Sequence, residues 1–495
     1  MRPLTIAIDP VLTQSFGHQI CWTWRTLLTG MGFAWNEVDL DTPGCDLAYV
    51  TDATATSARL VIRADVAKWK AGDAPRLIAV DRSGPLQCLR YSGEPSNGPI
   101  VADQGRLIFD RDVIFDVFWL ATGQAERGWR KGAHGIFDLD QEPAVTRDVL
   151  RDAVASAVGC GLERLIREVT ALAPLDRWPN GKRLAACVGH DVDYPEVIRL
   201  LEPVRVLARQ GLAGARNAWA VAVGSRHHWH FGSWLKLEES LGVRSAFYFV
   251  PRRGSLIERA LGTPDPFYDI RDAAFQSLFR DLRARGVEIG LHASYRAYED
   301  PDGIKQEKER LEEAAGIVVA GNRHHYWHLN PDDPAQTLRH HERAGLEYDA
   351  SLFHDRYIGW RRGFTWPFFP FDEEERRTIR TLQIPTGWMD DQLFGLKRHN
   401  PGDRTSILQE LVDQVAAQQG CFMIDVHEYV FDPALFPGWA AAYKFALERL
   451  VERGDVWFAT PSDVAKHWQA RTAGLLAASR GLTDAACRHL QPTVH

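Results

Sequence analysis

The chain has 495 residues, a net charge of −7 and 45% hydrophobic residues, which is the composition of a folded globular protein long enough for two or three domains. With this acidic balance, no general basic patch argues for nucleic-acid binding. Its apolar runs are too short for a transmembrane helix or a signal peptide. Seven scattered cysteines without a CxxC pair indicate free thiols in a reducing compartment. We therefore expect a cytoplasmic protein.

Residues 1–175 are expected to form a smaller α+β module. Several short strand patterns are followed by an apolar helical segment at Asp110–Leu120 and by a long helix over Thr146–Leu172. No catalytic constellation is visible in this module, and the sequence does not indicate its role. The segment Pro174–Lys182, with two prolines, an asparagine and a glycine, has the composition of a linker.

Residues 176–470 alternate strand and helix patterns. This alternation predicts an α/β fold, a distorted (β/α) barrel of about seven or eight strands. An open doubly wound sheet is the alternative, but no Gly-rich phosphate loop follows any strand. Residues 471–495 are expected to form a C-terminal helical tail. The predicted strands are Leu184–Gly189, Arg244–Val250, Val287–Leu291, Ile317–Ala320, Glu347–Ser351, Thr381–Ile384, Cys421–Val426 and Val456–Thr460.

The first strand of this barrel, in the stretch Leu184–Tyr194 (LAACVGHDVDY), ends in clustered ionisable residues. Positions two apart on an extended chain point to the same side, so Asp191 and Asp193 are expected to face one site. Two carboxylates that close repel each other unless a cation neutralises them. The stretch therefore indicates one wall of a site at the carboxyl ends of the strands.

Other predicted strands also end in polar groups. They supply His292 and Ser294, then Arg323 with three histidines at 324, 325 and 328, and finally Asp425 with His427. Aspartate and histidine together favour a divalent metal, with zinc as the first choice and manganese, cobalt or nickel also compatible. Any one of these histidines could instead be a satisfied hydrogen-bonding residue, but their joint placement after separate apolar strands favours a real site.

At these residues the sequence resembles the polysaccharide deacetylases, the NodB-homology domains of carbohydrate esterase family 4. The resemblance covers residues 183–465, and a segment before it is similar to the domain that precedes some of these chains. The motifs that carry it are HDVD at His190–Asp193, RSAFYFVP at Arg244–Pro251, GLHAS at Gly290–Ser294, GNRHH at Gly321–His325 and IDVH at Ile424–His427.

The resemblance implies a role for each matching residue. Asp191 would be the general base, Asp193 a metal ligand and His292 a second ligand. Arg323 would orient the base, and His427 would be the general acid. The aspartate that tunes this histidine in the family is best matched by Asp390, in the segment PTGWMDD.

Two departures from the family pattern stand out. Val192 separates aspartates that are usually adjacent, and Arg296 occupies the position of the second metal histidine. Arginine has no free lone pair with which to bind a metal. The third ligand would then be His325, with His324 as second choice; a water molecule in that position, or loss of metal binding, stays open.

Aromatic residues follow the same strands and could stack on sugar rings: Tyr194, Tyr295, Trp327, Trp360 and Trp366. Packing at the rim of the barrel is an equally good interpretation. The function implied is metal-dependent removal of an N- or O-linked acetyl group from a sugar or glycan precursor. The alternatives are a catalytically altered barrel that binds glycan or scaffolds a biosynthetic complex, and an amidohydrolase for a small cyclic amide.

Overall fold

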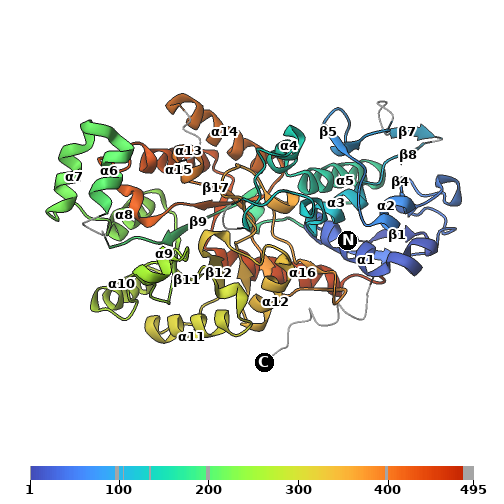
Figure 1. The fold of residues 1–495 in the computed structure, drawn as a ribbon. Coiled ribbons are helices and arrows are strands. Elements are labelled where there is room, and N and C mark those ends of the chain that lie inside the picture. The colour runs from blue at the N-terminus through green and yellow to red at the C-terminus, as the bar shows by residue number, and fades with distance from the viewer. Residues whose placement is uncertain are drawn as a thin grey trace.

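A computed structural model describes residues 2–94, 100–103, 105–132, 135–196, 201–395 and 400–482. Two large sheets dominate it, a six-stranded sheet in the first part of the chain and a nine-stranded sheet in the second. Figure 1 shows the first part, in blue, at one end of an elongated molecule and the second part filling the rest. None of the helices in the described ranges is both long and apolar enough to cross a bilayer.

The first sheet has the strand order β2-β1-β3-β4-β8-β7, and all of its pairs are parallel except β7 with β8. A separate hairpin pairs β5 with β6. The strands are β1 (Leu4–Ile8), β2 (Trp35–Glu37), β3 (Leu47–Val50), β4 (Leu60–Arg63), β5 (Leu77–Asp81), β6 (Cys88–Tyr91), β7 (Ile100–Asp103) and β8 (Arg106–Phe109).

Five helices accompany the first sheet. They are α1 (Pro10–Met31), α2 (Val66–Ala71), α3 (Val113–Ala121), α4 (Ala144–Asp152) and α5 (Val154–Thr170). The sequence patterns did not reveal α1, in which small and polar residues interrupt the apolar stripe. The single long helix predicted over Thr146–Leu172 is two helices, because Ala153 takes a left-handed conformation with φ of 48°. Asp112 caps α3, accepting the backbone N–H of Phe115, as expected for a cap residue.

The second sheet is all parallel and has the order β16-β13-β12-β11-β10-β9-β18-β17, with β19 paired to β9. This order confirms the predicted α/β class and the distorted barrel. The strands are β9 (Leu184–Val192), β10 (Ala246–Phe249), β11 (Glu288–Ala293), β12 (Gly321–His324), β13 (Tyr348–Asp349), β16 (Leu382–Gln383), β17 (Thr386–Met389), β18 (Cys421–Asp425) and β19 (Val456–Phe458).

The two ends of this sheet are neighbours in the chain. Only Ile384 and Pro385 separate β16, which pairs with β13, from β17, which pairs with β18. The segment thus completes the curl of the sheet, and a short hairpin of β14 (Phe371–Asp372) with β15 (Arg377–Thr378) precedes it.

Helices lie between the barrel strands and bury an apolar face against them. In α10, four large apolar residues at helical spacing (Phe275, Leu278, Phe279 and Leu282) are all buried. The helices are α6 (Glu202–Gln210), α7 (Ala215–Ala222), α8 (Phe231–Leu241), α9 (Leu256–Ala260), α10 (Ala273–Ala284), α11 (Gly303–Ala315), α12 (Pro334–Arg343), α13 (Asp391–Phe394), α14 (Pro401–Ala417), α15 (Trp439–Arg453) and α16 (Pro461–Ala477).

One predicted strand is misplaced. The apolar run Ile317–Ala320 is not the fourth barrel strand; β12 is the polar stretch Gly321–His324, all of it buried. Val318 in the apolar run is 81% exposed. Whether a strand is buried in a barrel depends on the strands that pair with it on both sides. β12 lies between β11 and β13, so it is buried although its sequence is polar.

The two parts of the chain share one apolar core. Buried residues of the first module, such as Trp24, and of the barrel interior, such as Met423, belong to one continuous cluster. The predicted linker Pro174–Lys182 is part of it, with Trp178 only 1% exposed and Arg177 donating to the carbonyl oxygens of Gly30 and Gln418.

The last described residues return to the first sheet. Arg480 forms a parallel bridge with Asn36 of β2, with hydrogen bonds to the backbone of Trp35 and Glu37. Residues beyond 482, which include Cys487 and most of the predicted tail, lie outside the described ranges.

Candidate metal centre

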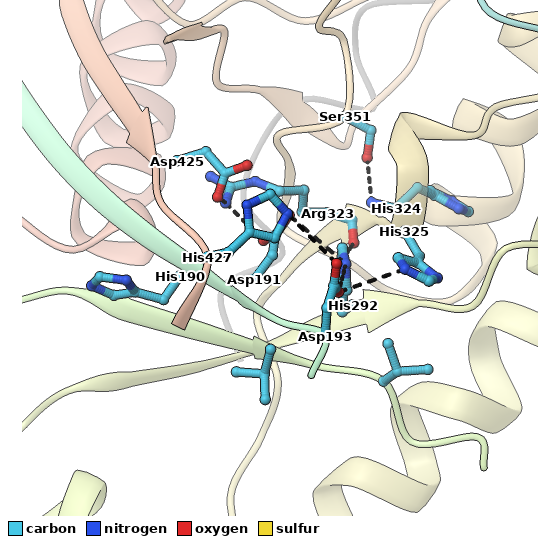
Figure 2. A network of polar contacts seen from close by, with 12 residues as sticks. His190, Asp191, Asp193, His292, Arg323, His324, His325, Ser351, Asp425 and His427 are labelled. Carbon is cyan, nitrogen blue, oxygen red and sulfur yellow. Dashed lines mark hydrogen bonds and ion pairs between the residues drawn. The ribbon is translucent and has the colours of Figure 1, made fainter. Parts of the chain in front are cut away.

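Alternation along β9 decides which side chains enter the site. Asp191 and Asp193 point into it, two residues apart, as the sequence predicts. His190 points the other way, where its Nε2 lies 2.7 Å from Oε1 of Glu238 and its ring stacks on Phe247. Figure 2 shows His190 turned away from the cluster formed by the other labelled residues.

Asp193, His292 and His325 meet at the carboxyl ends of β9, β11 and β12. One ligand atom from each lies within 4.8 Å of the others, and all three residues are buried. The Nε2 atoms of His292 and His325 are 3.3 Å and 3.6 Å from Oδ1 of Asp193. All three of these atoms are buried without a hydrogen-bond partner. Unpaired polar atoms that face one another in a protein interior are costly, and a divalent cation would satisfy all three.

The other ring nitrogen of each histidine is fixed by an acceptor. Nδ1 of His292 donates to the carbonyl oxygen of Arg323 at 2.6 Å, and Nδ1 of His325 donates to Oδ1 of Asp265 at 3.1 Å. A proton held on Nδ1 leaves the Nε2 lone pair directed at the group. This is the arrangement of a metal-ligating imidazole with a second polar group behind it.

The electrostatics of the three residues also favour a cation. Burial would raise the pKa of Asp193, but the imidazoles of His325 and His292 hold it well below its usual range. Burial would lower the pKa of His325, but the carboxylates of Asp193 and Asp265 raise it to about 10. The group thus stabilises positive charge, whether a proton or a metal supplies it.

Asp191 lies beside this group but has a different partner. Nη1 of Arg323 donates to Oδ1 of Asp191 and to Oδ1 of Asp425, both at 2.8 Å, with all three residues buried. Burial raises the pKa of Asp425 well above its usual range despite the guanidinium, with Asp191 adding to the rise. Oδ2 of Asp191 also lies 3.8 Å from Nε2 of His292, so this carboxylate lies between the arginine and the metal group.

The glycines of the motifs make room for this arrangement. A Cβ on Gly189 would lie 2.7 Å from Nη2 of Arg323, and one on Gly290 would lie 2.5 Å from the ring of Tyr248. The guanidinium of Arg323 stacks over that ring, 4.5 Å from its centroid. Arg323 and Tyr248 fill the barrel interior behind the site. They leave no room for a side chain at Gly189 or Gly290, the glycines that precede the polar residues of β9 and β11.

His427 and Asp390 form a second pair at the rim. Nδ1 of His427 donates to Oδ1 of Asp390 at 2.9 Å, and its backbone N–H donates to Oδ2 of the same carboxylate at 2.8 Å. Nε2 then points toward Asp193, 3.5 Å from its Oδ2. Burial would lower the pKa of His427, but Asp390 and Asp193 raise it well above its usual range. Asp390 thus fixes the orientation of the imidazole, with Nε2 directed at the metal group.

Two acidic residues that the sequence did not single out hold the site in place. Asp265 accepts the N–H of Tyr295 at 2.8 Å and a hydrogen bond from Arg252 at 2.8 Å, besides its contact with His325. Glu428 accepts the backbone N–H groups of Asp193 and Tyr194 at 3.0 Å and 3.1 Å. Glu428 directly follows the IDVH motif, whereas Asp265 lies in a loop without any motif.

The other predicted candidates lie at varying distances from the group. Tyr194 is half-buried beside it, while Tyr295 and Trp327 are 9% and 7% exposed and pack on His328 and Phe353 respectively. Trp360 is fully buried and packs against Gly387, so the structure does not bring it to the group. Trp366 is likewise in the core.

The remaining polar candidates point elsewhere. Nε2 of His324 lies 2.8 Å from Nε2 of His341, away from the metal group. The side chain of Arg296 is 61% exposed and donates to Glu299 at 3.0 Å. Arg296, at the position where the family has its second histidine, therefore lies outside this group. The second histidine of the group is His325.

No family model matches the chain, and no match was found among curated proteins. Solved structures similar to it include a chain assigned as a polysaccharide deacetylase in Mycobacterium smegmatis, with 19% identity and a TM-score of 0.39 over 61% of this chain and 94% of that one. The allantoinase Puue has 18% identity and a TM-score of 0.39 over 61% and 95%. A chain assigned as a polysaccharide deacetylase in Pseudomonas aeruginosa PAO1 has 19% identity and a TM-score of 0.38 over 60% and 95%.

Proposed function

We propose that this protein is a metal-dependent hydrolase that removes an acetyl group, linked through nitrogen or oxygen, from a sugar or glycan precursor. The observation that carries the proposal is the set of three unpaired, buried ligand atoms on Asp193, His292 and His325. The carboxylate of Asp191 lies near His292 on one side of this set, and the imidazole of His427 lies near Asp193 on the other. Two nitrogen ligands and one oxygen ligand favour zinc, although manganese, cobalt and nickel also accept such a set.

Asp191 has the geometry of a general base. Its Oδ1 is held by Arg323, and its Oδ2 faces His292. Such a fixed carboxylate can take a proton from a water molecule that attacks the acetyl carbonyl. A divalent cation bound to the three ligands would supply Lewis acidity toward that carbonyl.

His427 has the geometry of a general acid. Asp390 fixes its Nδ1 proton, so Nε2 can deliver a proton to the nitrogen or oxygen atom that leaves. At 14% side-chain exposure, His427 is more accessible than the three buried ligands, which supports its role as the acid on the side from which substrate would arrive.

Metal analysis and acetate release test this proposal together. We expect the purified protein to retain close to one divalent ion per chain, and zinc-loaded protein to release acetate from acetylated sugars. Asp193→Ala should abolish both, while Arg296→Ala, at an exposed position outside the group, should abolish neither.

Absence of any bound metal, or acetate release that persists in Asp193→Ala, would contradict the proposal. Sugar binding without any acetate release in the metal-loaded protein would favour the glycan-binding alternative.

A further inference from the structure

Exposed apolar side chains are concentrated beside the metal centre. The described residues include fourteen large apolar side chains that are exposed, and nine of them lie in two short segments. The first segment, 201–223, follows β9 and contains α6 and α7; the second, 256–261, follows β10 and contains α9. The nine side chains are Leu201, Val204, Leu207, Leu212, Trp219, Val223, Leu256, Ile257 and Leu261.

These side chains stand out from the surface. Leu212 is 93% exposed in the turn between α6 and α7, and Trp219 on α7 is 70% exposed. In the second segment Ile257 is 74% exposed and Leu261 is 81% exposed. The opposite side of α6 is anchored, because Val206 is fully buried. In Figure 1, α6 and α7 lie at the end of the molecule farthest from the first sheet.

The first segment and the residues around the second contain more arginines than acidic residues, although the whole chain has a net charge of −7. Between residues 201 and 226 there are four arginines and one acidic residue, Glu202, which is buried and paired with Arg209. Between residues 252 and 263 there are three arginines and one glutamate. Arg216 and Arg253 are exposed beside the apolar side chains. Arg226 pairs with Asp432, and Arg252 pairs with Glu258 and Asp265, so the surface is apolar with a small excess of positive charge.

Both segments border the metal centre through one residue. The guanidinium carbons of Arg205, on α6, and of Arg259, on α9, each lie 5.7 Å from the centroid of the Tyr194 ring. Tyr194 directly follows the candidate metal ligand Asp193. The apolar and basic surface thus flanks the carboxyl ends of the strands from which the candidate site is built.

We propose that the 201–223 and 256–261 segments bind the surface of an anionic membrane, and that the metal centre therefore acts on an acetylated sugar attached to a membrane lipid; the second part rests on the proposed function. Apolar side chains that project singly from short amphipathic helices, with arginines beside them, suit the headgroup region of a bilayer. Tryptophan favours that depth, and arginines near the surface are attracted by anionic lipid. A protein partner would be expected to need a flatter and more continuous apolar surface.

Vesicle co-sedimentation of the full-length protein tests the docking. We expect binding to vesicles of phosphatidylcholine with a quarter of phosphatidylglycerol, weaker binding to phosphatidylcholine alone, and loss of binding with added salt. The double variant Leu212→Gln and Trp219→Gln should lower binding by about tenfold or more, because both apolar anchors are removed. The double variant Arg216→Gln and Arg253→Gln should weaken binding to the vesicles that contain phosphatidylglycerol, and should leave binding to phosphatidylcholine alone unchanged.

The matched control is Val318→Gln, which changes an apolar residue that is 81% exposed but precedes β12, at the opposite end of the barrel strands. It should bind vesicles like the wild type. Wild-type protein that does not sediment with the anionic vesicles would overturn the proposal. A wild-type dimer in solution that the Leu212→Gln and Trp219→Gln variant converts to a monomer, without any vesicle binding, would assign the surface to a second copy.

Acetate release separates the two parts of the proposal. We expect faster release from an acetylated sugar on a lipid in anionic vesicles than from the same sugar free in solution. The Leu212→Gln and Trp219→Gln variant should lose that advantage and keep its rate on the free sugar. Equal rates of the wild type on both substrates would overturn the lipid-linked assignment. Acetate from neither substrate, with vesicle binding intact, would overturn the proposed function and the assignment that rests on it, but not the docking.

Discussion

Asp265 Oδ1 lies 3.1 Å from Nδ1 of His325, on the side of the imidazole opposite to the metal group. A carboxylate in this position fixes the ring and raises its basicity, and loss of such a partner typically weakens metal binding by about 10- to 100-fold. We expect that loss for Asp265→Asn, measured by titration of the metal-free protein with zinc. Asp269→Asn, in the same loop but partly exposed, should bind zinc normally. Equal affinities of the two variants would show that Asp265 does not position His325.

Removal of the metal should destabilise the protein. A ligand that binds only the folded state adds free energy of unfolding, about 4 kcal/mol when its concentration is a thousand times Kd. Treatment with a chelator should therefore lower the Tm of the wild type, and zinc should restore it. His325→Ala should show no zinc-dependent change in Tm, because one of the three ligands is missing. A full zinc response in this variant would exclude His325 as a ligand.

The pH dependence of kcat should report His427. The charge of Asp390 raises the pKa of this imidazole, and a general acid must be protonated, so activity should fall as the pH rises through that pKa. Asp390→Asn removes the charge, so the alkaline limb of the profile should move to lower pH and kcat should fall. Asp391→Asn changes the neighbouring carboxylate, which does not contact the ring, and should move the limb less. Unchanged alkaline limbs in Asp390→Asn would argue against His427 as the acid.

Asp116, far from the site, should make stability depend on pH. Burial raises its pKa to about 7, whereas an unfolded chain releases this proton near pH 3.9. Between these two pH values the folded state holds a proton on Asp116 that the unfolded chain has released. The contribution of this proton to the free energy of unfolding is therefore complete below about pH 4 and is lost as the pH rises to about 7.

Asp116→Asn keeps an acceptor for the hydroxyl of Tyr91 and removes this penalty. The variant should gain on the order of a few kcal/mol relative to the wild type at pH 8, and less at pH 5. Urea unfolding at the two pH values measures the gain. Asp110→Asn, at an exposed site, serves as the control and should show no such difference. An equal gain in the free energy of unfolding at both pH values would contradict the raised pKa of Asp116 in the folded state.

Gly321→Ala should destabilise the barrel. Its Cβ would lie 1.9 Å from Cζ of Tyr348, whose hydroxyl is fixed by hydrogen bonds to Tyr248 and Glu288. We expect a loss of about 1–3 kcal/mol or more in the free energy of unfolding by urea. Gly474→Ala in α16 meets nothing within 4 Å and should not destabilise, since alanine favours a helix. Similar stabilities of the two variants would contradict this packing.

The alternation of strands and helices in the barrel followed from the sequence, although β17 matches no predicted strand. Apolar runs bounded by glycine marked β9, β11 and β18 because these strands have apolar neighbours. The same signal failed at β12, where the apolar run Ile317–Ala320 is a connecting segment and the buried strand is polar. Its burial depends on the pairing with β11 and β13, which a local pattern does not contain.

Asp265 and Glu428 show the same limit at the site. Asp265 is separated by sixty residues from the histidine it contacts, and only the fold brings the two together. Glu428 lies next to a motif, but its contacts are with backbone N–H groups of another strand. A positioning residue that lies in a loop without a motif, as Asp265 does, has no local sequence signal.

The return of Arg480 to β2 has a consequence for synthesis of the chain. The backbone partner of Trp35 and Glu37 leaves the ribosome some 440 residues after them. Until then the first sheet has an uncovered edge strand, and open edges of this kind are where chains pair wrongly. The first sheet therefore gains this backbone partner only after all the strands of the barrel have been made.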